Sequence, residues 1–396
     1  MLLRGEQQAV HAHMARALRL AELGLCTTQP NPRVGCVLAR GEEIVGEGWH
    51  QRAGEAHAEV FALRAAGERS RGATAYVTLE PCAHFGKTPP CADALIAAGV
   101  SRVVVAHEDP FHKVDGQGLA KLRAAGIIVE TGLLRDAARE LNRGFFSRVE
   151  RKRPWLRVKL AMSLDGRTAL ANGDSKWISG EAARADVQHW RARSSAIMTG
   201  SGTVLADDPG LTVRRDLSEQ PQRFVPESSA DRHPASPSTA ARDAIQGITQ
   251  AQQFRPLRVV LDRTLRTPRA AKVLDGSAPT LIVHGTDVTP DDRFARVELA
   301  FAPLRDGQPD LAHVLRMLAE RGVNELQVEA GATLCGALFA VGLVDELLLY
   351  IAPILLGDRG HPLLRLPACE AIDAAPRMRI VEQRQVGDDQ RLVLRA

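Results

Sequence analysis

Apolar residues in the first part of the chain alternate between helical and strand spacing. One stripe at helical spacing predicts an N-terminal helix: Val10, Met14, Ala17, Leu18, Ala21 and Leu25. Residues 34–38 and 43–48 predict a hairpin around the polar turn 40–42. Further strands are predicted at 75–80, 102–106 and 127–129, and further helices from 57 and at 92–98, 117–125 and 134–149. This alternation is typical of an α/β layer.

A second series of apolar strands begins after Pro154, which ends the preceding helix. These strands are predicted at 156–161, 194–199, 257–261, 280–284 and 325–329. Two of them run into glycine-containing turns, at 200–203 and 330–334, a geometry that presents backbone N–H groups to a phosphate. We therefore predict two domains, 1–150 and 151–396. Residues 216–256 are rich in Pro, Ser, Gln and Ala, which predicts a loop or partly disordered insertion.

Composition narrows the class of protein. A chain of 396 residues can bury two cores. The net charge of +4 is mild, which argues against a dedicated nucleic-acid surface and suits an anionic small substrate. Six scattered cysteines without a secretory segment indicate reduced thiols in the cytoplasm. No apolar run approaches the ~20 residues that cross a bilayer, so we expect no membrane contact.

Three short motifs predict a zinc site. His57 opens a predicted helix, Cys82 follows a predicted strand, and Cys91 opens another helix. One imidazole and two thiolates leave a tetrahedral Zn²⁺ one open position for water. Glu59 lies two residues after the histidine, where it would shuttle protons without binding the metal. A His-x-Glu followed by Pro-Cys and a second Cys is the signature of nucleobase and nucleoside deaminases.

The spacing of the cysteines differs from that of most deaminases, which have about two residues between them. Here the residues from 83 to 90 separate Cys82 from Cys91. The longer loop must fold back to close the site or help to hold the substrate.

Longer motifs resemble one known family, the bifunctional deaminase–reductases of riboflavin biosynthesis. The first half matches it at 28–36 (TQPNPRVGC), 48–60 (GWHQRAGEAHAEV) and 78–91 (TLEPCAHFGKTPPC), the last of which includes the long cysteine spacing. The second half matches it at 159–167 (KLAMSLDGR), 175–178 (SKWI), 202–209 (GTVLADDP), 211–214 (LTVR) and 328–331 (VEAG).

The resemblance implies a fold and two reactions. The first domain would be a cytidine-deaminase-like three-layer α/β/α domain, and the second a dihydrofolate-reductase-like α/β domain. The first would use Zn²⁺ to deaminate the pyrimidine of 2,5-diamino-6-(5-phosphoribosylamino)pyrimidin-4-one. The second would use NADPH to reduce the ribosyl side chain to ribityl. No Gly-x-Gly-x-x-Gly fingerprint follows a strand, in agreement with this second fold.

The resemblance also implies site residues. Those expected to bind NADPH are Ala161, Trp177, Thr203, Asp207, Gly331, Ala332, Thr333, Leu334, Cys335, Gly336 and Ala337. Those expected to bind substrate are Asn31, Ser175, Arg191, Leu211, Arg214 and Glu329. Guanidinium groups bind phosphate bidentately, so Arg191 and Arg214 suit a phosphate clamp, although each would equally suit a surface ion pair.

Three alternatives stay open on the sequence alone. A nucleic-acid deaminase would share the zinc motif, but it needs a basic, aromatic-lined path, and aromatic residues are 4% of this chain. A structural zinc module would need a fourth ligand, for which His84 and Cys36 are candidates. The second half would be a degenerate regulatory domain if it bound no NADPH. A homo-oligomer, either dimer or tetramer, is the general expectation.

Overall fold

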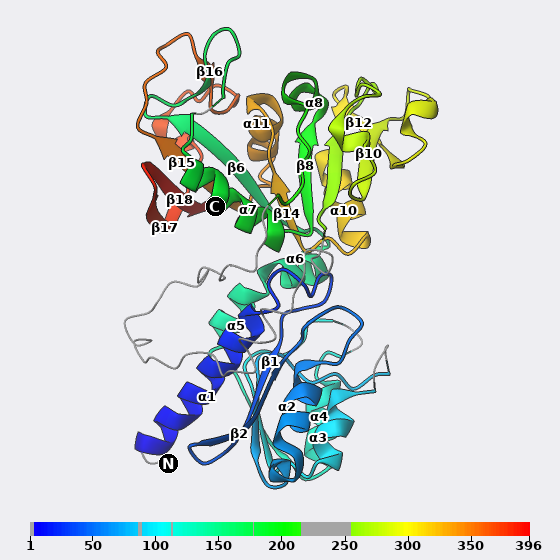
Figure 1. Cartoon of the computed structure of the whole chain (residues 1–396), viewed down its shortest axis with the longest axis vertical. Coiled ribbons are helices and arrows are strands. Elements are labelled where there is room, and N and C mark those ends of the chain that lie inside the picture. Colours follow the sequence, from blue (N-terminus) through cyan, green and yellow to red (C-terminus); the bar gives the residue numbers. More distant parts are fainter. Residues whose placement is uncertain (1–3, 86–88, 112–113, 177, 215–254) are drawn as a thin grey trace. The chain divides into compact units, whose positions relative to one another are not determined.

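The computed structural model describes residues 4–85, 89–111, 114–176, 178–214 and 255–396. These residues form two compact units, one ending at Arg151 and the other beginning at Lys152 (Figure 1). The predicted insertion 216–256 lies outside the described residues up to position 254, and so does Trp177. No helix in the described part of the chain is both long and apolar enough to cross a membrane.

The first unit is built on a five-stranded sheet of order β2-β1-β3-β4-β5. The hairpin β1–β2 and the pair β1–β3 are antiparallel, whereas β3–β4 and β4–β5 are parallel. The elements are α1 (Arg4–Glu22), β1 (Gly35–Arg40), β2 (Glu43–Trp49), α2 (Ala58–Ala66), β3 (Thr74–Val77), α3 (Cys91–Ala97), β4 (Arg102–Val105), α4 (Gln117–Ala124), β5 (Ile128–Thr131), α5 (Arg135–Leu141) and α6 (Arg143–Arg151).

Helices cover both faces of this sheet and make three layers. Successive side chains of a strand point to opposite faces, so β1 contributes to two cores. Val37 packs with Met14 of α1 on one face. Leu38 packs with Ala62 of α2, and with residues of α3 and α4, on the other face. The predicted hairpin, N-terminal helix and alternating layer are confirmed.

Glycines on β2 bring helix α2 close to the sheet. A Cβ atom on Gly46 would lie 2.3 Å from the carbonyl oxygen of Ala62, and one on Gly48 would lie 2.4 Å from that of Ala58. Only glycine permits this separation. The first turn of α2, with His57 as its N-cap, is thereby fixed against the strand.

The predicted single helix 134–149 is wrong, because the chain forms two helices that meet at Asn142. The Asn142 side chain forms hydrogen bonds with a segment far away in the sequence. Its Oδ1 accepts from the Arg33 backbone N–H at 2.8 Å, and its Nδ2 donates to the Arg33 carbonyl at 2.8 Å. These two hydrogen bonds hold the segment that carries Asn31.

We expect Asn142→Ala to destabilise the first unit by about 1–3 kcal/mol, because it leaves two buried backbone groups of Arg33 without partners. Hydrogen exchange of the α1 and β1 amides in the full chain would measure the loss. Arg135→Ala on the preceding helix is the control, since its ion pair with Glu108 is 54% and 36% exposed and should contribute less than about 1 kcal/mol. Equal effects of the two variants would contradict the role of the amide.

The second unit is built on a nine-stranded sheet of order β11-β10-β9-β8-β14-β6-β15-β18-β17. The strands from β11 to β15 are parallel, and the last two pairs are antiparallel. Its main elements are β6 (Trp155–Ser163), β7 (Arg167–Ala169), α7 (Glu181–Arg193), β8 (Ala196–Gly200), α8 (Ser201–Asp207), β9 (Leu257–Leu261), β10 (Thr280–Gly285), β11 (Glu298–Ala302), α10 (Leu311–Glu320), β14 (Glu325–Val328), α11 (Ala332–Ala340), β15 (Glu346–Ala352), β17 (Arg379–Val386) and β18 (Asp389–Arg395).

Both faces of the central strands are buried. Met198 of β8 packs with Leu318 of α10 and Leu338 of α11 in one core. Its neighbour Ile197 packs with Val204 of α8 in a second core on the opposite face. Near-continuous apolar strands are typical of such a doubly covered parallel sheet. The carboxyl ends of β6, β8, β9 and β14 therefore lie along one edge, where open α/β sheets bind ligands.

Candidate active sites

His57, Cys82 and Cys91 converge in the first unit, as their motif predicts. The Nδ1 atom of His57 lies 3.2 Å from Sγ of Cys91 and 3.6 Å from Sγ of Cys82. All three ligand atoms lie within 4.8 Å of one another. Tetrahedral Zn²⁺ with ordinary bond lengths separates a nitrogen ligand from a sulfur ligand by about 3.5 Å. The residues therefore fit a zinc ion.

Electrostatics at the two thiols also favour a cation. A hydrogen bond from Cys91 lowers the pKa of Cys82 to about 4. The same contact raises the pKa of Cys91, with burial adding to the shift. The thiolate of Cys82 therefore opposes the ionisation of Cys91, and a bound cation is what stabilises two thiolates side by side. Hydrogen bonding to Cys82 in turn raises the pKa of His57.

No fourth ligand joins this cluster among the described residues. Neither His84 nor Cys36 belongs to it, although both are described. Cys36 is instead buried in the core, and burial raises the pKa of its thiol. Three protein ligands leave one coordination position open, the arrangement of catalytic rather than structural zinc.

Glu59 lies beside the cluster in the first turn of α2 and is only 3% exposed. Burial raises the pKa of its carboxyl to about 7. Its Oε2 atom is buried without a hydrogen-bond partner among the described residues. A buried oxygen with no partner is costly unless a substrate or water completes its bonding. The position of Glu59 and its pKa of about 7 suit a group that accepts and returns a proton near neutral pH.

Asn31 is connected to the same site through His50, a residue that no motif in the sequence marks as part of the site. The amide Nδ2 of Asn31 lies 3.1 Å from Nε2 of His50, and Nδ1 of His50 donates to the Ala56 carbonyl at 3.0 Å. The ring of His50 also lies edge-on to that of His57, with centroids 5.3 Å apart. Because the Ala56 carbonyl can only accept, Nε2 of His50 is the acceptor for Asn31.

The chain reaches Cys82 by leaving the sheet earlier than predicted. Strand β3 ends at Val77 rather than at Glu80. The Glu80 carboxylate turns away to accept from the backbone N–H groups of Gly116 and Gly118, at 3.1 and 2.9 Å. It thereby fixes the start of α4 against the segment that carries Cys82. Asp109, whose backbone N–H also bonds Glu80, has its pKa raised to about 7 by burial.

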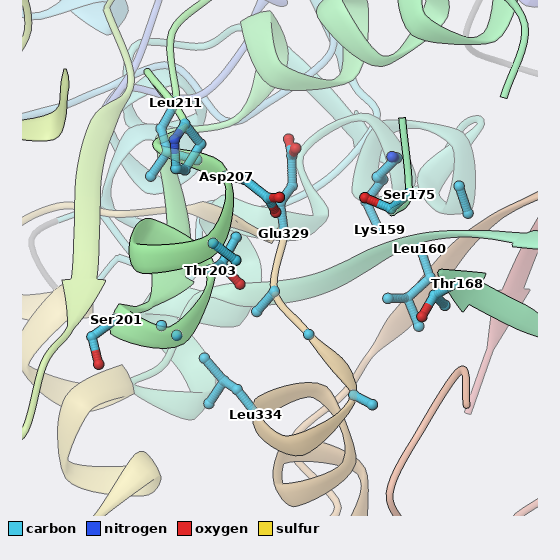
Figure 2. Close-up of a pocket in the computed structure, with 18 of the residues that line it drawn as sticks. Lys159, Leu160, Thr168, Ser175, Ser201, Thr203, Asp207, Leu211, Glu329 and Leu334 are labelled. Atoms are coloured by element: carbon cyan, nitrogen blue, oxygen red, sulfur yellow. The ribbon is translucent and has the colours of Figure 1, made fainter. Parts of the chain in front are cut away.

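The second unit contains a cavity of about 1650 Å³ at the carboxyl ends of its strands. Figure 2 shows Lys159, Ser175 and Glu329 directed toward it from separate elements. The predicted site residues that line it are Ala161, Ser175, Arg191, Thr203, Asp207, Leu211, Arg214, Glu329, Gly331, Ala332, Thr333, Leu334 and Ala337. Lys159 of β6 lines it as well.

Two residues expected on the cofactor wall do not line the cavity. Cys335 is fully buried, packs in the core beneath α11 and donates its thiol to the Ala330 carbonyl. Gly336 lies against the backbone of Arg365, where a Cβ atom would come within 2.0 Å of the carbonyl oxygen. Residues 332–337 are helical, so only one face of this run meets the cavity. Gly331 begins it as the N-cap of α11, with open space around its Cα.

Arg191 is bonded to protein groups rather than left free as a phosphate clamp. Its Nε and Nη2 donate to the two carboxylate oxygens of Glu329, both at 2.7 Å, and its Nη1 donates to the Thr212 carbonyl. Burial alone would raise the pKa of Glu329, but the charge and hydrogen bonds of Arg191 lower it to about 2. Arg191 therefore lines the cavity as expected, and its ion pair holds the Glu329 carboxylate in place.

Arg214 and Lys159 keep their cationic groups toward the cavity. The backbone N–H of Arg214 donates to Gln188 at 3.0 Å, while its side chain is exposed and has no ion pair among the described residues. Burial lowers the pKa of Lys159, and Glu329 opposes that shift. Leu211 has its side chain in the core and a left-handed backbone, with φ of 47°.

These geometries define the class of protein. Residues 7–107 match the family model of the cytidine and deoxycytidylate deaminase zinc-binding region. Residues 154–392 match the model of the RibD C-terminal domain. The chain is thus a zinc-dependent deaminase joined to a reductase.

Known proteins match almost the whole chain. The riboflavin biosynthesis protein RibD of Escherichia coli K12 is 47% identical over 95% of this chain and 96% of its own length. That of Haemophilus influenzae is 45% identical over 96% and 95%. Form 1 of Acinetobacter baumannii RibD has a TM-score of 0.85 at 40% identity, covering 98% of this chain and 99% of that one.

A structure from Thermotoga maritima is described as a diaminohydroxyphosphoribosylaminopyrimidine deaminase/5-amino-6-(5-phosphoribosylamino)uracil reductase. It has a TM-score of 0.80 at 30% identity, covering 98% of this chain and 99% of that one. The chain belongs to the RibD family of bifunctional deaminase–reductases of riboflavin biosynthesis, which use Zn²⁺ and NADPH. The predicted family, fold class and cofactors are confirmed, and the second unit is accounted for, which a nucleic-acid deaminase would leave unexplained.

Proposed function

We propose that this chain carries out two consecutive steps, one in each unit. Residues 1–150 deaminate 2,5-diamino-6-(5-phosphoribosylamino)pyrimidin-4-one to 5-amino-6-(5-phosphoribosylamino)uracil and release ammonia. Residues 151–396 reduce the ribosyl side chain of that product to ribityl. The observation that carries the proposal is the convergence of His57, Cys82 and Cys91 beside the unpartnered buried oxygen of Glu59.

In the deaminase site, His57, Cys82 and Cys91 would hold Zn²⁺. The chemistry that the ion would supply is a lowered pKa of a water molecule, which would make hydroxide available at neutral pH. Glu59 accepts the proton of the attacking water at Oε2, delivers it to the ring nitrogen and then assists the departing amine. Its pKa of about 7 suits both directions of transfer. Asn31, oriented by His50, hydrogen-bonds the pyrimidine.

In the reductase site, NADPH supplies the hydride. The residues proposed to hold it are Ala161, Trp177, Thr203, Asp207, Gly331, Ala332, Thr333, Leu334 and Ala337. The N–H groups at the start of α11 suit its pyrophosphate. Ser175, Leu211, Arg214 and Glu329 would hold the substrate, with Arg214 on its phosphate and Lys159 nearby. Arg191 acts through Glu329 as a positioning residue.

The remaining partners follow from this chemistry. The substrate is a small phosphorylated pyrimidine, and we propose that neither nucleic acid nor membrane takes part. We also propose a cytoplasmic homo-oligomer, a dimer or a tetramer. The reduced state of all six cysteines suits that compartment.

We expect removal of zinc to separate the two activities. Chelation should stop ammonia release, because no group then acidifies the attacking water. Reduction of supplied 5-amino-6-(5-phosphoribosylamino)uracil should continue, because its cavity is in the other unit. Metal content by mass spectrometry, with both activities assayed before and after zinc is restored, tests this. Ammonia release at full rate from metal-free protein would contradict the proposal.

A further inference from the structure

One wall of the cavity in the second unit is formed by residues to which no role has yet been assigned. Arg266 follows strand β9 and lines the cavity together with Ser201, the first residue of α8. The Nη2 of Arg266 donates to Oγ of Ser201 at 3.1 Å, and its backbone N–H donates to the Asp262 carboxylate at 2.9 Å. Arg266 is thus held once through its backbone and once through its guanidinium, while the residue stays exposed.

The other exposed cations of this wall are already paired. Arg263 pairs with Asp287 at 3.1 Å, and Lys272 pairs with Asp208 at 3.3 Å. Within the described parts of the chain, Arg266 has no carboxylate partner within 4.0 Å. A guanidinium has five N–H donors, and a single hydroxyl contact leaves most of them available. This position therefore favours an anion from a ligand.

The sheet order places Arg266 at the far end of the cavity from the reacting groups. The strands run β9-β8-β14-β6, with Arg266 after β9, Ser201 after β8, Glu329 after β14 and Lys159 on β6. Three strand steps of about 4.8 Å span about 14 Å. Figure 2 shows Ser201 on the opposite side of the pocket from Lys159 and Ser175. A dinucleotide with its nicotinamide beside Lys159 would therefore extend its adenosine half toward Arg266.

We propose that Arg266, held by Ser201, binds the 2′-phosphate of NADPH and selects NADPH over NADH. This inference rests on the proposed reductase function and adds the residue that recognises its cofactor. A planar guanidinium matches a phosphate with two parallel hydrogen bonds. NADH carries a neutral hydroxyl at the 2′ carbon. It therefore gains neither the attraction between charges nor the two parallel hydrogen bonds. The cofactor residues assigned above supply no such cation.

Calorimetric titration of the full-length protein tests the assignment. Three variants are compared with the wild type: Arg266→Gln, Arg266→Lys and Arg269→Gln. The probes are NADPH, NADH and 2′,5′-ADP. We expect Arg266→Gln to weaken NADPH and 2′,5′-ADP by about 10–100-fold, the range for losing hydrogen bonds to a charged group, and to leave NADH unchanged. Arg266→Lys should lose less, because it keeps the charge without the planar fork.

Arg269→Gln is the matched control. Arg269 lies three residues further on, is 65% exposed and pairs with Asp292 outside the cavity. The Arg269→Gln variant removes the same net charge as Arg266→Gln, but outside the cavity. We therefore expect it to leave all three affinities unchanged. Because the Arg266 side chain is exposed, its replacement should not unfold the second unit, and unchanged hydrogen exchange of the β8 and β9 amides would show that this unit is intact.

Two results would overturn the assignment alone. Equal weakening of NADPH and NADH by Arg266→Gln would place the guanidinium on a part common to both cofactors. Unchanged NADPH binding by Arg266→Gln would show that Arg266 does not contact the cofactor. A wild-type chain that binds neither dinucleotide would instead overturn the reductase function, and the assignment with it.

Discussion

Replacing Glu59 with Gln should lower ammonia release by about 10²–10⁴-fold, the usual contribution of general acid–base catalysis. The amide has nearly the same size as the carboxyl, so it fits the buried position, but it cannot accept the proton of an attacking water. Glu59 is 3% exposed and its Oε2 has no partner among the described residues. No protein hydrogen bond to that oxygen is lost on substitution, so we expect the variant to fold normally.

Three controls make this result specific. Reduction of supplied deaminated intermediate should be unchanged in Glu59→Gln, because the reductase cavity belongs to the other unit. Zinc content should also be unchanged, because Glu59 is not among the three ligands. Glu55→Gln, an exposed carboxyl on the loop before α2, should keep both activities. Loss of both activities in folded Glu59→Gln protein would refute the two-site account.

Replacing Arg191 with Met should destabilise the second unit by about 3–5 kcal/mol, the cost of removing one partner from a buried ion pair. The side chains of Arg191 and Glu329 are 8% and 15% exposed. Without the guanidinium, the Glu329 carboxylate lies in a poorly solvated site with Lys159 as its nearest remaining cation. Hydrogen exchange of the β14 and α7 amides in the full chain would measure the loss in this unit alone.

The same variant should slow reduction by about 10²-fold, because the displaced carboxylate no longer positions the substrate. Ammonia release should be unaffected. Arg269→Met is the matched control, since its pair with Asp292 is 65% and 80% exposed and should contribute less than about 1 kcal/mol. If Arg191→Met cost no more than Arg269→Met, Arg191 would not be the residue that holds Glu329.

Local patterns in the sequence were sufficient for most elements and for the zinc cluster. Helix α1 and the β1–β2 hairpin follow from the spacing of apolar residues around short polar turns. The convergence of His57, Cys82 and Cys91 follows from motifs at the ends of helices and strands, where the α/β layer brings the three side chains together. These features depend on residues close together in the chain and on the known arrangement of an α/β layer. They could therefore be predicted without knowing which distant residues contact one another.

The errors came from contacts between residues far apart in the chain. Asn142 lies at the break between two helices, its side chain bonds the backbone of Arg33, and neither position signals the other. Arg191 forms an ion pair with Glu329, 138 residues later in the chain, and nothing near either residue in the sequence signals this contact. Cys335 was assigned to a continuous binding run, although the turn of α11 directs it into the core. Tertiary packing decided each of these cases.

The most direct test is a coupled assay on purified, zinc-replete protein with 2,5-diamino-6-(5-phosphoribosylamino)pyrimidin-4-one. Ammonia release is followed with and without NADPH while NADPH oxidation is recorded in the same sample. The account predicts that ammonia appears without NADPH, and that NADPH is consumed only after ammonia has been released. Ammonia release that requires NADPH, or NADPH consumption that precedes deamination, would contradict two sites acting in sequence.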